Sequence, residues 1–346
     1  MTLRTEAITK VVAGVTHIKP ATLDLAPGQF NVLLGPTGAG KTSLIKMMAG
    51  LDPIASGKVI LNGEDVTRLS PQKRRISLVH QFFVNYPHMS VRENIASPLK
   101  VAKMAKSEID GRVAEAANIL QLTPMLDRKP HELSGGQQQR CALARAIAKD
   151  SQAVFLDEPL ANLDYKLREE LREQLPELFA GRGAVVVYAT SEPEEALMLG
   201  GQTALVEDGH LRQVGPTADI YRAPGSLNAA RIFSDPPINA GDVVVRAGTA
   251  TMGATTWATD KSDGQYVFAI RPHHVLPHPS SGAPTQLMGR VGVTELSGSE
   301  SSAHFDLDGA PWVSLAHGVH PFEIGEIHTF YMNPAHGFWF DAGGQV

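Results

Sequence analysis

Short, uninterrupted apolar runs alternate with helical patterns over the first two thirds of the chain. Four of these runs predict buried strands, at residues 30–34, 153–156, 184–188 and 203–206. Buried parallel strands are apolar on both faces, and helices connect them. The alternation therefore predicts an α/β domain with a mostly parallel sheet.

The pattern becomes purely helical between about residues 90 and 150. Apolar residues at Ile109, Val113, Ala116 and Ile119 have the spacing of one helix face, and no run in this stretch predicts a strand. A helical subdomain is therefore expected inside the α/β domain.

The composition changes near residue 235. The Pro- and Gly-containing stretch 234–241 is interpreted as a linker. Beyond it, short β-rich runs separated by Gly and Pro predict a small β-barrel or sandwich. These runs are 242–245, 266–270, 303–307 and 327–332. Two domains are expected, residues 1–235 and 236–346.

The amino-acid composition argues against a nucleic-acid-binding protein, a disulfide-linked protein and a membrane-spanning protein. The 346 residues are 43% hydrophobic, and 31 Lys and Arg against 36 Asp and Glu give a net charge of −5. This balance lacks the basic excess that a nucleic-acid backbone requires. The single cysteine, Cys141, excludes an internal disulfide and is expected to be a small buried hydrophobe. No apolar run approaches the length of a membrane span, so a role at a membrane would need partners.

A glycine-rich motif follows the first predicted strand and begins a helix at 43–48. It fits G-x-x-x-x-G-K-[ST], in which glycines let backbone N–H groups surround a polyphosphate. Lys41 is expected to reach the terminal phosphates, and the hydroxyl of Thr42 to bind Mg²⁺. The residues assigned to nucleotide binding here are Gly35, Pro36, Thr37, Gly38, Ala39, Gly40, Lys41, Thr42 and Ser43.

Two adjacent carboxylates, Asp157 and Glu158, follow the apolar run 153–156. Ligands of doubly wound sheets bind at the carboxyl ends of the strands. Asp157 therefore suits Mg²⁺ ligation, and Glu158 suits a general base or water-orienting group for attack on the γ-phosphate. In isolation such a pair is more often a strand-end cap, but the phosphate loop upstream favours the catalytic interpretation.

A second candidate anion site begins the helix that continues to residue 148. Ser134 is expected to be its N-cap, followed by Gly135, Gly136 and Gln137. An ordinary capped helix has the same pattern. Two phosphate sites in one chain nevertheless suggest one nucleotide held between two copies or homologues.

Together, these motifs resemble those of the ATP-binding subunits of ATP-binding cassette (ABC) transporters, in the carbohydrate-importer class with a C-terminal β-domain. The likeness covers essentially the whole chain. Residues 133–137 match the family's LSGGQ signature, Gln81 its Q-loop and Asp164, in 161–164, its D-loop. The resemblance implies a P-loop (RecA-like) core with an antiparallel β subdomain, a helical subdomain and a C-terminal OB-like regulatory barrel. It also implies ATP and Mg²⁺ as cofactors.

The resemblance further implies roles and partners. Two subunits would pack head to tail, with each ATP between one phosphate loop and the other chain's signature. Glu158 would position water, Gln81 would sense Mg²⁺ and the γ-phosphate, and Thr42, Gln81 and Asp157 would hold the metal. Segment 82–94 would contact two membrane-spanning permease subunits, with a solute-binding protein involved indirectly. The chain would be peripheral, on the cytoplasmic side of the inner membrane.

The alternative for segment 82–94 is that Phe82, Phe83 and Tyr86 are ordinary core aromatics. Two other patterns are expected to have no catalytic role. The basic run 73–75 is interpreted as a solvated face, and His273 and His274 are expected on opposite faces of a strand, which disfavours a metal site.

Two positions depart from the family pattern. Ser191 stands where relatives have a switch histidine, and serine cannot carry a positive charge. Val12 aligns with the adenine-stacking aromatic and offers no ring. We hypothesise that the chain's own site hydrolyses ATP slowly while its signature completes a competent site on a different ATPase. The alternative is that Ser191 with a bound water replaces the histidine.

Within the class, segments 85–98, 160–170 and 189–196 resemble one ATPase of glycerol-uptake transporters that use two different ATPases. The resemblance implies import of glycerol or a related polyol or carbohydrate. The alternatives are a homodimeric sugar-importer ATPase and an ABC ATPase of DNA repair or translation. The last class is expected to show a coiled-coil insertion or tandem cassettes, and this sequence has one phosphate loop and one signature.

Overall fold

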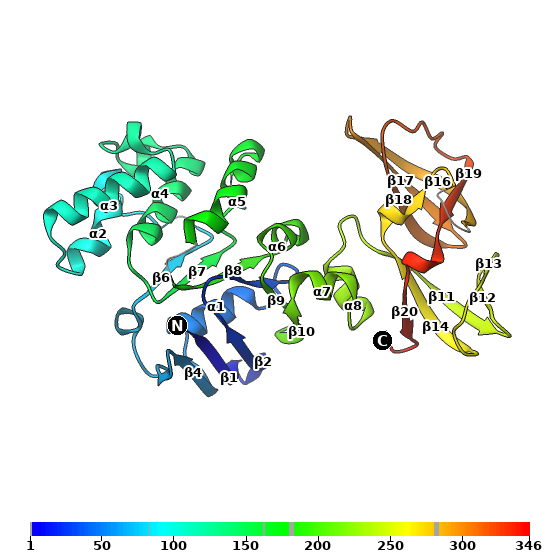
Figure 1. The fold of residues 1–346 in the computed structure, drawn as a ribbon, viewed down its shortest axis with the longest axis horizontal. Coiled ribbons are helices and arrows are strands. Elements are labelled where there is room, and N and C mark those ends of the chain that lie inside the picture. The colour runs from blue at the N-terminus through cyan, green and yellow to red at the C-terminus, as the bar shows by residue number, and fades with distance from the viewer. Residues whose placement is uncertain (1, 83, 162, 180–182, 280–283) are drawn as a thin grey trace. The chain divides into compact units, whose positions relative to one another are not determined.

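The structure is a computed structural model that describes the whole chain except residues 1, 83, 162, 180–182 and 280–283. Contacts divide the chain into two compact units, Met1–Ala218 and Asp219–Val346 (Figure 1). Helix α8 (Leu227–Ile232) belongs to the second unit, where Ala230 packs with Ile238 and Phe340. The domain boundary after residue 235 stays a prediction. Each unit is described by itself below.

The first unit is built on a six-stranded sheet with the order β10-β9-β3-β8-β7-β6. Its strands are parallel except β10, which pairs antiparallel with β9. All four apolar runs that predicted buried strands form β3, β7, β8 and β9, which confirms the α/β class. The strand bounds are β3 Phe30–Leu34, β6 Ile76–Val79, β7 Ala153–Asp157, β8 Val185–Thr190, β9 Gln202–Glu207 and β10 His210–Pro216.

A second sheet of the same unit has the order β2-β1-β4-β5, with all pairs antiparallel. Helix α1 (Lys41–Ala49) shares one hydrophobic core with both sheets, in which Leu44 and Met48 lie with Leu23 and Phe155. The burial of Leu44, Ile45, Met47 and Met48 agrees with the apolar character of α1. The strand bounds are β1 Leu3–Val12, β2 Val15–Leu25, β4 Ser56–Leu61 and β5 Glu64–Asp65.

The helical subdomain consists of α2 (Val91–Val101), α3 (Lys106–Ile119) and α4 (Gly135–Ala148), which lie together in Figure 1. The predicted face of α3 is buried at Ile109, Val113 and Ala116. Helices α5 (Tyr165–Phe179) and α6 (Pro193–Leu199) flank β8 in the sequence. None of the helices in the described part of the chain is long and apolar enough to cross a membrane.

Arg74 corrects the expectation that the basic run 73–75 is a solvated face. Its side chain is buried and donates hydrogen bonds to the carbonyl oxygens of Met47 (3.2 Å) and Met48 (2.7 Å) at the end of α1. It also donates to the carbonyl groups of Thr67 and Leu69. The last carbonyls of a helix lack intrahelical partners and carry partial negative charge, so a cation there is stabilising.

The second unit contains two five-stranded sheets, ordered β13-β12-β11-β14-β20 and β15-β19-β16-β17-β18. One core that includes Trp257, Phe268, Trp312 and Phe330 joins them, as expected for a small barrel. Helix α7 (Thr217–Arg222) spans the division between the units. The strand bounds are β11 Asn239–Arg246, β12 Thr249–Met252, β13 Thr255–Ala258, β14 Gly264–Ile270, β15 Val275–Leu276, β16 Thr285–Leu296, β17 Glu300–Leu307, β18 Ala310–His317, β19 Ile327–Met332 and β20 Phe338–Asp341.

The linker predicted at 234–241 extends too far, because its last three residues belong to β11, which begins at Asn239. This residue is buried, and its amide side chain donates to the carbonyl of Val313 (2.8 Å) and accepts from the Val313 N–H (2.6 Å). Asparagine is common in loops, but Asn239 lies in a strand, and its buried side chain links β11 to β18.

The expected placement of His273 and His274 on opposite strand faces is also wrong. Both lie in a 3₁₀ turn (Pro272–His274) that a proline begins, with ring centroids 4.3 Å apart. His336 stacks on His274 at 4.5 Å, and burial lowers the pKa of His274 to about 4. Among the described residues, no group of three or more His, Cys, Asp or Glu is placed to hold a metal ion.

The Arg74 cap generates a stability prediction. Arg74→Met keeps most of the packing but removes every donor, so it should lower the free energy of unfolding by about 3 kcal/mol. Urea unfolding followed by far-UV circular dichroism would measure this loss. Lys73→Ala, on the exposed neighbour, is the control, and equal midpoints for the two variants would contradict the capping role.

Candidate functional site

The loop between β3 and α1 is shaped by two glycines that have no room for a side chain. A Cβ on Gly35 would collide with the carbonyl oxygen of Val206, and one on Gly40 would lie 2.6 Å from Cδ1 of Ile18. Gly40 also has φ of 109°, which side chains rarely adopt. The fit of the loop against β2 and β9 therefore requires glycine at both positions.

Lys41, the first residue of α1, is bent back over this loop. Its ammonium group donates to the carbonyl oxygens of Gly35 (2.6 Å) and Pro36 (3.0 Å) and lies 3.5 Å from Oε1 of Glu158. The side chain is only 5% exposed. Burial lowers the pKa of Lys41, and the carboxylate of Glu158 opposes that shift. A cation held among loop backbone groups at a helix N-terminus is suited to bind phosphate.

Asp157 ends β7 and is almost completely buried. Its Oδ1 accepts a hydrogen bond of 2.9 Å from the hydroxyl of Thr42, which ties β7 to the start of α1. Burial raises the pKa of Asp157 despite this hydrogen bond, so the site favours an added positive charge. Hard oxygen ligands of this kind fit Mg²⁺, with Thr42 and Asp157 as the residues that would hold it.

Glu158 turns away from Asp157 because its backbone is left-handed, with φ of 46°. Its N–H donates to the carbonyl of Ala189 in β8 (3.0 Å), and its Oε2 accepts a hydrogen bond of 2.8 Å from Gln81, which follows β6. Asp157 therefore contacts Thr42 in α1, whereas the next residue, Glu158, contacts Gln81 after β6. The left-handed turn at a non-glycine residue is the kind of backbone strain that clusters at functional sites.

The carboxyl ends of β3, β6 and β7 therefore bring five predicted residues into one cluster. Two come from the start of α1, one follows β6, and two come from the end of β7. We call this set, Lys41, Thr42, Gln81, Asp157 and Glu158, the sheet-edge cluster.

Two family models and several known proteins match this chain. The ABC transporter family model matches residues 18–161, and the TOBE domain model matches residues 268–340. The sn-glycerol-3-phosphate import ATP-binding protein of Paracoccus denitrificans is 36% identical over 96% of this chain and 95% of its own length. The diacetylchitobiose uptake system ATP-binding protein of Streptomyces coelicolor is 38% identical over 86% of this chain and 85% of its own length.

The chain belongs to the ATP-binding subunits of ABC transporters. It is an ABC-type ATPase coupled to import, with ATP as its nucleotide. The ATP-binding cassette MJ0796, solved as a dimer in a post-hydrolysis state with ADP and Pi, superposes with a TM-score of 0.57 at 27% identity. It covers 62% of this chain and 98% of its own.

The signature of this ABC ATPase lies at the start of α4, in the helical subdomain. Ser134 is the N-cap and forms a capping box with Gln137, whose N–H donates to the serine hydroxyl (3.3 Å). Ser134 and Gly135 are exposed. An exposed helix N-terminus can accept an anion from outside the chain. Cys141, further along α4, is buried as predicted, and burial raises the pKa of its thiol to about 11.

The two departures from the family pattern lie at the end of β1 and directly after β8. Val12 ends β1 and is 52% exposed, two residues after Lys10, whose ammonium group donates to Ser43 in α1 (3.3 Å). Ser191 is exposed and directly follows Thr190, whose carbonyl accepts from the N–H of Gly35 (3.4 Å). Asp164 is exposed just before α5, and the neighbouring Asn162 lies outside the described residues.

Segment 82–94 presents exposed aromatic side chains. Phe82 is 72% and Tyr86 is 44% exposed, which contradicts the core alternative for these two residues, whereas Phe83 lies outside the described residues. The fully buried amide of Asn94 donates to the carbonyl of Tyr86 (3.1 Å) and accepts from its N–H (2.8 Å). The loop is therefore held in shape while its apolar side chains face solvent.

Sequence reasoning missed Gln139. It is 1% exposed and donates to the carbonyl of Pro159, so it links the signature helix to the backbone just after Glu158. A glutamine on the otherwise apolar buried face of α4 was the available signal.

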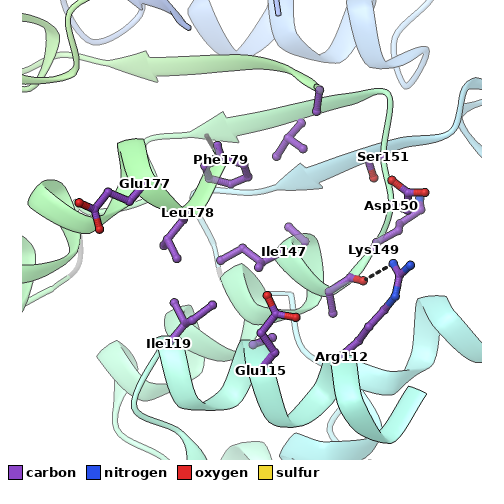
Figure 2. A pocket seen from close by; sticks show the side chains of 15 residues that line it. Arg112, Glu115, Ile119, Ile147, Lys149, Asp150, Ser151, Glu177, Leu178 and Phe179 are labelled. Carbon is purple, nitrogen blue, oxygen red and sulfur yellow. Dashed lines mark hydrogen bonds between the residues drawn. The ribbon is translucent and has the colours of Figure 1, made fainter. Parts of the chain in front are cut away.

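A cavity of about 670 Å³ lies away from the sheet-edge cluster, at the amino ends of β7 and β8 (Figure 2). Its floor is apolar, with Ile119, Ile147 and Phe179, and its rim carries charged side chains. Figure 2 shows Arg112 there, donating to the carbonyl of Ala148. The residues that line this cavity include none of the sheet-edge cluster.

The geometry of Glu158 generates a prediction. Glu158→Gln keeps an acceptor for Gln81 but removes the base, so it should lower the ATPase rate of the purified chain about 100-fold. ATP affinity should remain within about threefold, because the phosphate loop is untouched. Phosphate release and binding of a fluorescent ATP analogue would measure both. Glu108→Gln, in α3, is the control, and a rate equal to that control would refute the catalytic role.

Proposed function

We propose that this ABC ATPase powers the import of glycerol or a related polyol or carbohydrate, as a translocase subunit paired with a second, non-identical ATPase. It would be peripheral, on the cytoplasmic side of the inner membrane, with two permease subunits and, indirectly, a solute-binding protein as partners. The sheet-edge cluster is the observation on which the proposal rests. The relatives described above are ATP-binding proteins for import of sn-glycerol-3-phosphate and uptake of diacetylchitobiose, which supports a polyhydroxylated solute.

In this proposal the cluster residues have separate tasks. Lys41 binds the terminal phosphates, exchanging its loop carbonyls for phosphate oxygens. Thr42, Gln81 and Asp157 would hold Mg²⁺, which would neutralise phosphate charge when bound. Glu158 orients the attacking water and accepts its proton, and the hydrogen bond from Gln81 (2.8 Å) holds that carboxylate in place.

The proposal assigns Ser134, Gly135, Gly136 and Gln137 to the ATP of the partner site. The exposure of Ser134 and Gly135 at the start of α4 supports a head-to-tail pair, in which each nucleotide contacts one sheet edge and one signature. Segment 82–94 would contact the permeases, because its exposed aromatic side chains rest on a rigid, hydrogen-bonded loop.

The proposal of two different ATPases rests on Ser191 and Val12. In a homodimer both sites would lack a cation after β8 and an aromatic ring at the end of β1, so both would turn over poorly. A partner with an intact site would instead use the complete signature of this chain.

The Ser191→His variant tests this asymmetry. An imidazole can carry the positive charge that serine lacks, so ATPase activity at this chain's own site should rise about tenfold. Ser191→Asn, which adds size without charge, should leave the rate unchanged. Both variants would be measured in the chain alone and after reconstitution with the permeases, with and without the second ATPase.

Low activity alone and high activity only in the mixed complex would support the paired assembly. Strong activity of the wild-type chain alone would contradict it and favour a homodimer in which Ser191 suffices. Reconstituted vesicles would be assayed for uptake of labelled glycerol, sn-glycerol-3-phosphate and a disaccharide. Uptake of the disaccharide alone would contradict the small-polyol assignment.

A further inference from the structure

The loop that carries Ser191 is anchored by the residue after it. Glu192 is the N-cap of α6, but its side chain makes no capping hydrogen bond. Its backbone N–H instead donates to the side-chain hydroxyl of Thr190 (3.0 Å). The carboxylate is therefore available to bind groups outside its own helix.

Two arginines of α5 occupy both oxygens of that carboxylate. Arg168 donates to Oε1 (3.0 Å) and Arg172 donates to Oε2 (3.3 Å). The side chain of Arg172 is only 5% exposed and also donates to Glu169 (2.8 Å). Charge-assisted hydrogen bonds to a partly buried carboxylate are stronger than exposed ion pairs. We call Arg168, Arg172 and Glu192 the α5–α6 clamp.

Arg168 extends the clamp to the segment that precedes α5. Its other guanidinium nitrogen donates to the carbonyl of Ala161 (3.4 Å), and its backbone N–H donates to the carbonyl of Asp164 (2.9 Å). A single side chain thus bridges the segment 161–164 and the loop that carries Ser191.

The other side of the Ser191 loop is tied to the phosphate site. The carbonyl of Thr190 accepts from the N–H of Gly35 (3.4 Å), and the carbonyl of Ala189 accepts from the N–H of Glu158 (3.0 Å). Ser191 therefore lies between two sets of contacts, one to the sheet-edge cluster and one to the clamp.

We propose that Arg168 and Glu192 are positioning residues that fix Ser191 relative to the phosphate loop and couple it to segment 161–164. This inference rests on the proposed function. A serine hydroxyl is short, so its approach to a terminal phosphate, directly or through a water, depends on where the backbone holds it. If a second subunit displaced segment 161–164, Arg168 would transmit that movement to the loop that carries Ser191.

The Glu192→Gln variant tests the clamp, because it keeps the shape of the side chain but loses the charge. In a transporter reconstituted with this chain as its single kind of ATPase, so that turnover reports this chain's own site, kcat should fall about tenfold to a hundredfold while KM for ATP stays within about twofold. Glu194→Gln is the matched control, since Glu194 lies on the same helix, 4.0 Å from Arg172, and its side chain is 74% exposed. Its kcat should equal that of the wild type.

A second comparison separates positioning from mere stabilisation. Ser191→His should change kcat by a different factor in the Glu192→Gln background than in the wild type, because the clamp sets the position of residue 191. Arg168→Lys should recover part of the kcat that Arg168→Met loses.

Equal kcat for Glu192→Gln and Glu194→Gln would overturn the inference, and so would identical Ser191→His factors in the two backgrounds. A fall in kcat that only follows a lowered melting temperature would also overturn it. An ATPase rate insensitive to Glu158→Gln in the same single-ATPase assay would instead contradict the role of Glu158 in the proposed function.

Discussion

A hydrogen bond between the hydroxyl of Thr42 and the buried carboxylate of Asp157 joins the start of α1 to the end of β7. At 2.9 Å it fixes the helix N-terminus against the carboxyl edge of the parallel sheet. Lys41, Gln81 and Glu158 then meet at that edge, since each follows or begins an element that the sheet and α1 position. The positive helix terminus and the buried carboxylate together form a site for a phosphate chain and its metal.

Under the proposed pairing of two ATPases, the residues offered to the partner and those of this chain's own site lie in different parts of the first unit. The signature caps a helix in a separate subdomain, and its geometry does not depend on Ser191 or Val12. The clamp of Arg168, Arg172 and Glu192 holds the Ser191 loop firmly even though the residue it presents is neutral. Under the proposed function, these contacts would position a short, neutral side chain at a site that turns over slowly.

Much of the fold could be predicted because buried parallel strands are apolar along their whole length, as β3, β7 and β8 are. The glycines of the phosphate loop and the adjacent carboxylates also have local patterns. The failures have long-range causes. The basic run around Arg74 predicts a solvated side chain. Arg74 is buried because it donates hydrogen bonds to the unpaired carbonyl groups at the end of α1, which is distant in the sequence. Asn239 looks like a loop residue because its partner, Val313, lies on another sheet.

The pairing of Glu192 with two arginines of α5 was equally hidden, since it joins helices that are separate in the sequence. Gln139 could be suspected from its place on an apolar helix face, but its acceptor could not be predicted. Local sequence patterns thus predicted residues that the structure brings together in the sheet-edge cluster. Groups that position those residues required the three-dimensional contacts.

The central claim is that the sheet-edge cluster binds the phosphates of ATP, and calorimetric titration of the full chain with Mg²⁺-ATP tests it most directly. Lys41→Ala should weaken binding at least about tenfold, because charge-assisted hydrogen bonds to phosphate are lost. Lys100→Ala, on the exposed side of α2, should bind as the wild type does. Equal affinities for Lys41→Ala and the wild type would contradict the account.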